Sequence, residues 1–165
     1  MLAAFADLSA SSSPIDDALS IPRPFVPAPE TCVSRSDTEQ GVALPILDRL
    51  DVRIDPDQAR AGQAGAAEVT GWIRLADGAE ADVRSLLLFA DAFPPSLFGL
   101  LGAVGWVPSV ELTVHVRSRP APGWVLGRFS TSDLRDGRMV EDGTLWDSSG
   151  ELVARSRQLG LLLPR

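Results

Sequence analysis

Three residue types are missing from this chain of 165 residues, which contains no lysine, no tyrosine and no asparagine. The codons of all three are rich in A and T, so we attribute their absence to a GC-rich coding sequence. All fifteen basic residues are therefore arginine, and the formal net charge is −7. An acidic chain without a basic patch argues against nonspecific binding of nucleic acid. An anionic small ligand is compatible with the sequence only where arginines cluster.

Cysteine and histidine each occur once, as Cys32 and His115. A single cysteine excludes a disulfide within the chain and a cysteine-based metal site. With one histidine, a zinc site of the usual kind is also excluded. The sequence therefore predicts no metal and no cofactor.

Long apolar runs are absent as well. The most apolar stretch, residues 85–107, is interrupted by Asp91, Pro94 and Pro95, whereas a transmembrane helix needs about 20 mostly apolar residues. The first residues include the acidic Asp7 and lack a basic segment followed by an apolar one, so no signal peptide is expected. We expect a soluble, cytoplasmic protein that does not bind membranes.

Composition divides the chain at about residue 45. Residues 1–45 carry six of the thirteen prolines and few aromatic residues. Such a segment buries too little surface to offset the entropy of ordering it, so it is predicted to be a Pro/Ser-rich arm or linker. Its opening, residues 1–8, is apolar enough to pack as a short strand. Residues 46–165 are expected to form one folded domain.

Six segments of that domain have the patterns of β-strands, with turns between them. They are residues 46–54, 68–75, 110–117, 124–135, 138–146 and 151–163. Asp136-Gly137 is a preferred two-residue hairpin turn. Residues 82–93 are apolar on nearly every side and predict a helix buried all round, which Pro94 and Pro95 end or kink. The predicted fold class is α+β, with an antiparallel sheet of about six strands wrapped around one central helix.

Three polar residues each lie in a different apolar segment. Asp91 interrupts LLLFADAFPPSLFGLL, Ser109 opens the strand-like PSVELTVHVR, and Gln158 lies inside ARSRQLGLLL. A buried polar group without a hydrogen-bond partner costs about 1–3 kcal/mol, so one shared polar site is the favoured interpretation. Two alternatives stay open: Asp91 could cap the helical segment that begins at the prolines, and Ser109 could be an ordinary turn residue.

The order of these elements resembles that of the acyl-CoA thioesterase II-like family, and more narrowly the C-terminal hotdog of its double-hotdog members. The resemblance rests on ADAFPPSLF, VPSVELTVHVRSRPAPGW and EDGTLWDSSGELVARSRQLGLL and covers about residues 44–165. It implies a hotdog fold and hydrolysis of a fatty acyl-CoA to the free acid and CoA. The family's catalytic Asp, Ser or Thr, and Gln correspond to Asp91, Ser109 and Gln158. Asp91 would act as general base on a water that the other two orient.

The resemblance also implies a second hotdog, which these residues do not contain. A single hotdog exposes a sheet edge, so we expect a homodimer or pairing with another hotdog chain. The alternative function is a non-catalytic acyl-CoA-binding or assembly module that requires a partner chain.

Four arginines fall on two segments that could be neighbours in the sheet, and they are candidates for binding the CoA phosphates: Arg117, Arg119, Arg155 and Arg157. The alternative for them is a solvated outer face balanced by acidic residues. His115 shares the alternation of this face and is not expected to take part in catalysis.

Overall fold

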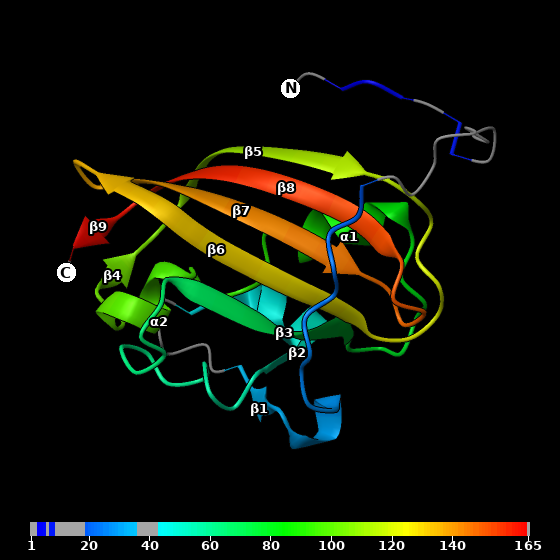
Figure 1. The fold of residues 1–165 in the computed structure, drawn as a ribbon, viewed down its shortest axis with the longest axis horizontal. Helices are drawn as coiled ribbons and strands as arrows, with labels where there is room; N and C mark the ends of the chain where they lie inside the picture. The colour runs from blue at the N-terminus through cyan, green and yellow to red at the C-terminus, as the bar shows by residue number, and fades with distance from the viewer. Residues whose placement is uncertain (1–2, 6, 9–18, 36–42, 165) are drawn as a thin grey trace.

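Seven strands of the protein form one antiparallel sheet in the order β1-β2-β3-β6-β7-β8-β5 (Figure 1). The computed structural model describes residues 3–5, 7–8, 19–35 and 43–164. The strands of this sheet are β1 (Val33–Ser34), β2 (Leu50–Ile54), β3 (Glu68–Leu75), β5 (Ser109–Val116), β6 (Val125–Arg135), β7 (Arg138–Trp146) and β8 (Leu152–Leu161). Two short strands, β4 (Gly105–Trp106) and β9 (Leu163–Pro164), pair with each other beside the sheet.

All six predicted strands are confirmed, as β2, β3, β5, β6, β7 and β8. The first is shorter than expected, because residues 45–49 form a 3-10 helix, η2 (Pro45–Arg49), before β2 begins. Asp136 and Gly137 have φ angles of 49° and 74°, the left-handed values that a type I′ hairpin turn requires of both central residues. The turn chemistry therefore fixes the register of β6 against β7.

The predicted helix over residues 82–93 is present as the shorter α1 (Val83–Phe89), and a second short helix, α2 (Leu97–Leu101), follows the two prolines. Pro94 and Pro95 lie in the connection, as expected for residues without a backbone N–H. α1 buries Leu86 and Phe89 completely, whereas Leu87 is 48% exposed. The prediction of a helix buried all round was therefore wrong, because only one face of α1 packs on the sheet.

The two faces of the sheet are covered by different parts of the chain (Figure 1). On the inner face, α1 packs into a core that includes Phe129 and Ile73. On the outer face, residues 19–28 cross the strands, and the indole N–H of Trp72 donates to the carbonyl of Pro27 at 2.8 Å. Val26 is buried beside that tryptophan. This part of the Pro-rich region therefore packs on the sheet although it forms no helix or strand.

The predicted strand at the start of the chain is not present in the residues that can be described there. Residues 3–5 and 7–8 contain no strand, and Phe5 is 94% exposed. The other residues of that expected strand, and residues 9–18 and 36–42 of the predicted arm, lie outside the described ranges.

α1 begins at a capping box. The Asp82 carboxylate accepts the backbone N–H groups of Arg84 and Ser85, each at 2.9 Å, and the Ser85 hydroxyl accepts the N–H of Asp82 at 3.1 Å. These are backbone donors that would otherwise lack an intrahelical partner. The backbone hydrogen bond from Ser85, followed by the side chain of Arg84, lowers the pKa of Asp82 to about 2.

Replacing Asp82 by alanine is expected to lower the melting temperature at pH 7, and Asp82→Asn to lower it less, because asparagine still accepts the backbone N–H groups. The pKa of Asp82 is below its ordinary value of 3.8, so the contribution of the charge is present above that value and is lost as the pH falls through about 2. Thermal unfolding followed by circular dichroism should show the difference between wild type and Asp82→Asn shrinking from about pH 4 to about pH 2. A difference that stays constant over this range would contradict the assignment.

Candidate active site

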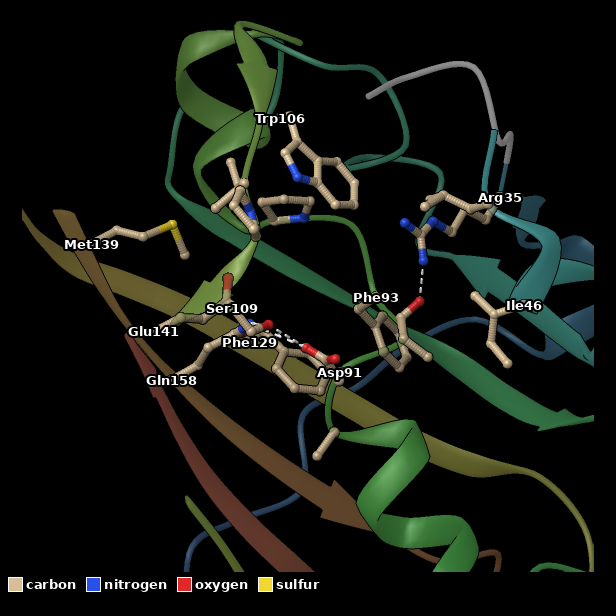
Figure 2. A pocket seen from close by; sticks show the side chains of 16 residues that line it. Arg35, Ile46, Asp91, Phe93, Trp106, Ser109, Phe129, Met139, Glu141 and Gln158 are labelled. Atoms are coloured by element: carbon tan, nitrogen blue, oxygen red, sulfur yellow. Dashed lines mark hydrogen bonds between the residues drawn. The ribbon is translucent and has the colours of Figure 1, made fainter. Parts of the chain in front are cut away.

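A cavity of about 310 Å³ lies between the connection after α1 and the inner face of the sheet (Figure 2). It is lined by side chains from several elements, including Asp91, Phe93, Trp106, Ser109, Phe129, Met139, Glu141 and Gln158. Its lining combines a cluster of polar side chains with aromatic rings. The cavity therefore suits a ligand with an apolar chain and a polar reacting group.

Asp91, Ser109 and Gln158 meet at the polar side of this cavity (Figure 2). The Ser109 hydroxyl donates to Oδ1 of Asp91 at 2.8 Å, and Nε2 of Gln158 donates to the same oxygen at 3.1 Å. Nε2 of Gln158 also donates to the Ser109 hydroxyl. The three residues are far apart in the sequence, and the fold brings them into one hydrogen-bonded triangle.

Each member of the triangle is placed by its own element. The backbone N–H of Asp91 donates to the carbonyl of Leu88 at 3.1 Å, which fixes Asp91 in the turn directly after α1. Ser109 is the first residue of β5, where it pairs with Gly160 of β8. Gln158 lies on the inner face of β8, two residues before that glycine.

The geometry does not support a capping role for Asp91 or an ordinary turn role for Ser109. The N-cap position of α2 is Ser96, not Asp91, so Asp91 does not cap this helix. Its carboxylate accepts two side-chain hydrogen bonds instead. Ser109 does begin a strand, but its hydroxyl is part of the triangle rather than of a local turn.

The aromatic side of the cavity consists of Phe93 and Phe129, whose ring centroids are 4.8 Å apart. The strands leave room for these rings by carrying glycine where a side chain would collide. A Cβ at Gly127 would lie 2.8 Å from the Phe93 ring, and a Cβ at Gly143 would lie 2.5 Å from the Phe129 ring. Both separations are below van der Waals contact, so the two glycines are what allows the aromatic wall to form.

Glu141 is a cavity residue that the sequence reasoning missed. Glu141 as a whole is only 6% exposed, and its Oε2 accepts the backbone N–H of Ser96 at 2.7 Å. Burial raises the pKa of Glu141 and the negative charge of Asp91 adds to this, while the hydrogen bonds from Ser96 act in the opposite direction. Strand alternation with Met139 and Gly143 was the available signal, because these residues share the inner face.

The four arginines predicted as phosphate ligands do not lie with the triangle. All four are exposed, and Arg155 and Arg157 alternate with Gln158 along β8, so they project from the opposite face. Arg157 also forms an ion pair with Asp142 at 2.8 Å. His115 is exposed and is paired with Arg155 across β5 and β8, away from the triangle. Arg35 is the arginine that borders the cavity, and its guanidinium donates to the carbonyl of Ala92.

The described residues contain neither a candidate metal site nor a candidate membrane-spanning helix. Within those ranges, no group of three or more His, Cys, Asp or Glu residues is arranged to hold a metal ion. No helix in the same part of the chain is long and apolar enough to cross a membrane.

A curved antiparallel sheet packed around a short helix, with a polar site beside that helix, defines a hotdog-fold protein. The structure is similar to that of a conserved protein of unknown function with hot dog fold from Alicyclobacillus acidocaldarius. The TM-score is 0.75 at 20% identity, and the match covers 89% of this chain and 56% of that chain. The predicted α+β hotdog class is thereby confirmed.

Two relatives have higher sequence identity. The structure of a putative thioesterase II from Thermobifida fusca has a TM-score of 0.76 and 31% identity, covering 96% of this chain and 58% of that chain. An uncharacterised protein of Mycobacterium tuberculosis is 31% identical over 85 residues, which are 52% of this chain and 29% of that protein. This chain therefore spans little more than half of the solved relative.

Residues 29–162 match the model of the family described as acyl-CoA thioesterase C-terminal domain. The chain belongs to this family, which confirms the resemblance found in the sequence.

Proposed function

We propose that this protein hydrolyses fatty acyl-CoA thioesters to the free acid and CoA, with Asp91, Ser109 and Gln158 as its catalytic residues. The observation that carries the proposal is the hydrogen-bonded triangle around the Asp91 carboxylate beside an apolar cavity. Membership of the acyl-CoA thioesterase family supports this type of chemistry. The aromatic pair Phe93 and Phe129 is the proposed wall for the acyl chain.

In the proposed reaction, Asp91 accepts a proton from water while the water oxygen attacks the thioester carbonyl carbon. The carbon–sulfur bond then breaks, and the proton leaves with the CoA thiolate. Both side-chain hydrogen bonds of the triangle reach Oδ1 of Asp91, so we assign proton transfer to Oδ2. Ser109 and Gln158 hold the carboxylate and orient the water.

A covalent acyl-enzyme is not part of this proposal. A serine nucleophile needs an adjacent base such as histidine to take its proton. The single histidine of the chain, His115, pairs across the sheet with Arg155 and does not line the cavity. The hydroxyl of Ser109 already donates to Asp91, which suits a role in orientation.

The proposed active form is a homodimer, or a pair with another hotdog chain. Among the strands of the described residues, β5 is the last of the sheet, and its Val110 is 62% exposed. An edge strand with exposed apolar side chains is a surface that proteins normally cover. The same edge favours the second candidate function, a non-catalytic acyl-CoA-binding or assembly module that acts with a partner chain.

The two candidate functions differ in turnover. We expect the purified chain to release thiol from a panel of acyl-CoAs of increasing length, and to have the mass of a dimer by light scattering. Asp91→Ala, measured in parallel, controls for contaminating thioesterase. A folded protein that binds acyl-CoA by calorimetry but releases no thiol would contradict the thioesterase proposal and favour the binding module.

A further inference from the structure

The carboxyl group of Glu141 lies beside the triangle, yet the hydrolytic step does not use it. Glu141 lines the same cavity as Asp91 and is 6% exposed. Its hydrogen-bond partner, the backbone N–H of Ser96, belongs to a residue that is completely buried. A buried carboxylate is costly unless it is hydrogen-bonded, so this contact needs a structural or functional reason.

The contact anchors the connection between α1 and α2, residues 90–96, which carries Asp91. Pro94 and Pro95 have no N–H, so Ser96 supplies the first backbone donor after them. That donor is bound by Glu141 of β7, and the hydroxyl of Ser96 forms a hydrogen bond of 2.8 Å with the hydroxyl of Thr131 of β6. The end of the connection is therefore tied to two neighbouring strands.

The opposite side of the connection has its own anchor. The guanidinium of Arg35, which follows β1, donates to the carbonyl of Ala92, the residue after Asp91 (Figure 2). The Phe93 ring, next in the chain, packs on Phe129. With these contacts the connection is held between β1 on one side and β6 and β7 on the other.

The position of Glu141 in the sheet relates this anchor to the triangle. Glu141 pairs directly with Gln158 in the register of β7 against β8. Glu141 thus binds the connection that carries Asp91. It also lies next to Gln158, which donates to Asp91 at 3.1 Å. A shift of the connection relative to β7 would change the Asp91–Gln158 distance.

We propose that Glu141 is a positioning residue, which accepts the Ser96 N–H and thereby holds the Asp91 carboxylate within hydrogen-bonding distance of Gln158. Its effect on turnover rests on the proposed thioesterase function. Its effect on the distance between Asp91 and Gln158 does not, so the two can be tested separately.

The test compares Glu141→Gln, which keeps an oxygen acceptor for the Ser96 N–H, with Glu141→Ala, which removes it. Glu141→Ala is expected to lower kcat by about 10- to 100-fold, because small displacements of a catalytic group have effects of that size. KM should change by no more than about threefold, and Glu141→Gln should stay within about threefold of wild type in kcat. Glu151→Ala, at an exposed glutamate, is the matched control and is expected to leave kcat unchanged.

Crystal structures of the same variants give a readout that does not depend on activity. The Asp91–Gln158 hydrogen bond should stay near 3.1 Å in wild type and Glu141→Gln and should be broken in Glu141→Ala. If Glu141→Ala does not fold, Glu141→Asp replaces it, since its shorter side chain withdraws the acceptor and should give the same losses.

Two results would overturn the proposal. One is an unchanged kcat with an unchanged Asp91–Gln158 distance in Glu141→Ala or Glu141→Asp. The other is a loss in Glu141→Gln as large as in Glu141→Ala, which would assign the effect to the charge of Glu141 rather than to its contact with Ser96. If wild type releases no thiol, the thioesterase function fails, and the distance in the variants still decides the positioning role.

Discussion

Asp91→Asn is expected to lower kcat for acyl-CoA hydrolysis by about 100-fold or more, the size typical of removing a general base. Asparagine has nearly the same shape, and its oxygen can still accept the hydrogen bonds that Ser109 and Gln158 donate to Oδ1. It cannot take up a proton from water. The variant therefore separates proton transfer from the geometry of the triangle.

The measurement is the release of thiol under saturating acyl-CoA, with thermal unfolding recorded on the same samples. The side chain of Asp91 is exposed, so the melting temperature should change little. Asp133→Asn, at an exposed carboxylate on β6, is the matched control and should keep wild-type turnover. A kcat within about threefold of wild type in Asp91→Asn would exclude Asp91 as the general base.

The triangle could be predicted because each member is polar in an apolar segment, although Asp91 and Ser109 are exposed rather than buried. Asp91 and Gln158 both interrupt runs of leucine or other apolar residues, and such a context is visible without any tertiary information. Glu141 has no such context. It is followed by Asp142, so the pair reads as a solvated charged stretch, whereas the partner that explains its burial is Ser96, 45 residues earlier. A contact of that kind is set by the tertiary fold.

The strands could be predicted from the local sequence, whereas the packing of residues 19–28 on the outer face of the sheet could not. The strands depend on local alternation and turn residues, so their order along the chain and their approximate bounds follow from the sequence. Residues 19–28 have no such pattern. They are held on the sheet by the indole N–H groups of Trp72 and Trp146, which donate to the carbonyls of Pro27 and Ile21. Local composition alone therefore predicted an arm where the structure has a packed segment.

The prediction that four arginines bind the CoA phosphates rested on the expectation that their two segments are neighbours in the sheet. β5 and β8 do pair, as the sequence suggested, and Arg155 lies opposite His115. Alternation along β8 nevertheless places Arg155 and Arg157 on the face opposite Gln158. Arg117, Arg155 and Arg157 do line one cavity, but it lies on the face of the sheet opposite the triangle.

Gln158→Ala is expected to lower kcat by roughly 10- to 100-fold, less than Asp91→Asn, because it removes donors to the base rather than the base itself. The hydrogen bond of 2.8 Å from Ser109 to Asp91 remains possible in this variant. Ser109→Ala leaves the 3.1 Å bond from Gln158 in place, so its effect should be of similar size or smaller. Gln63→Ala, at an exposed glutamine, is the matched control.

The double variant decides whether the two donors act together. Ser109 and Gln158 bind the same oxygen of Asp91 and also each other, and residues in one network are coupled by about 0.5–3 kcal/mol. Once one donor is removed, the Asp91 carboxylate is already free to move. Removing the second donor therefore changes its position, and kcat, by less. The loss of kcat in the double variant should therefore be smaller than the product of the two single losses. Losses that multiply would mean that Ser109 and Gln158 act on different steps, and the triangle would then not be one catalytic unit.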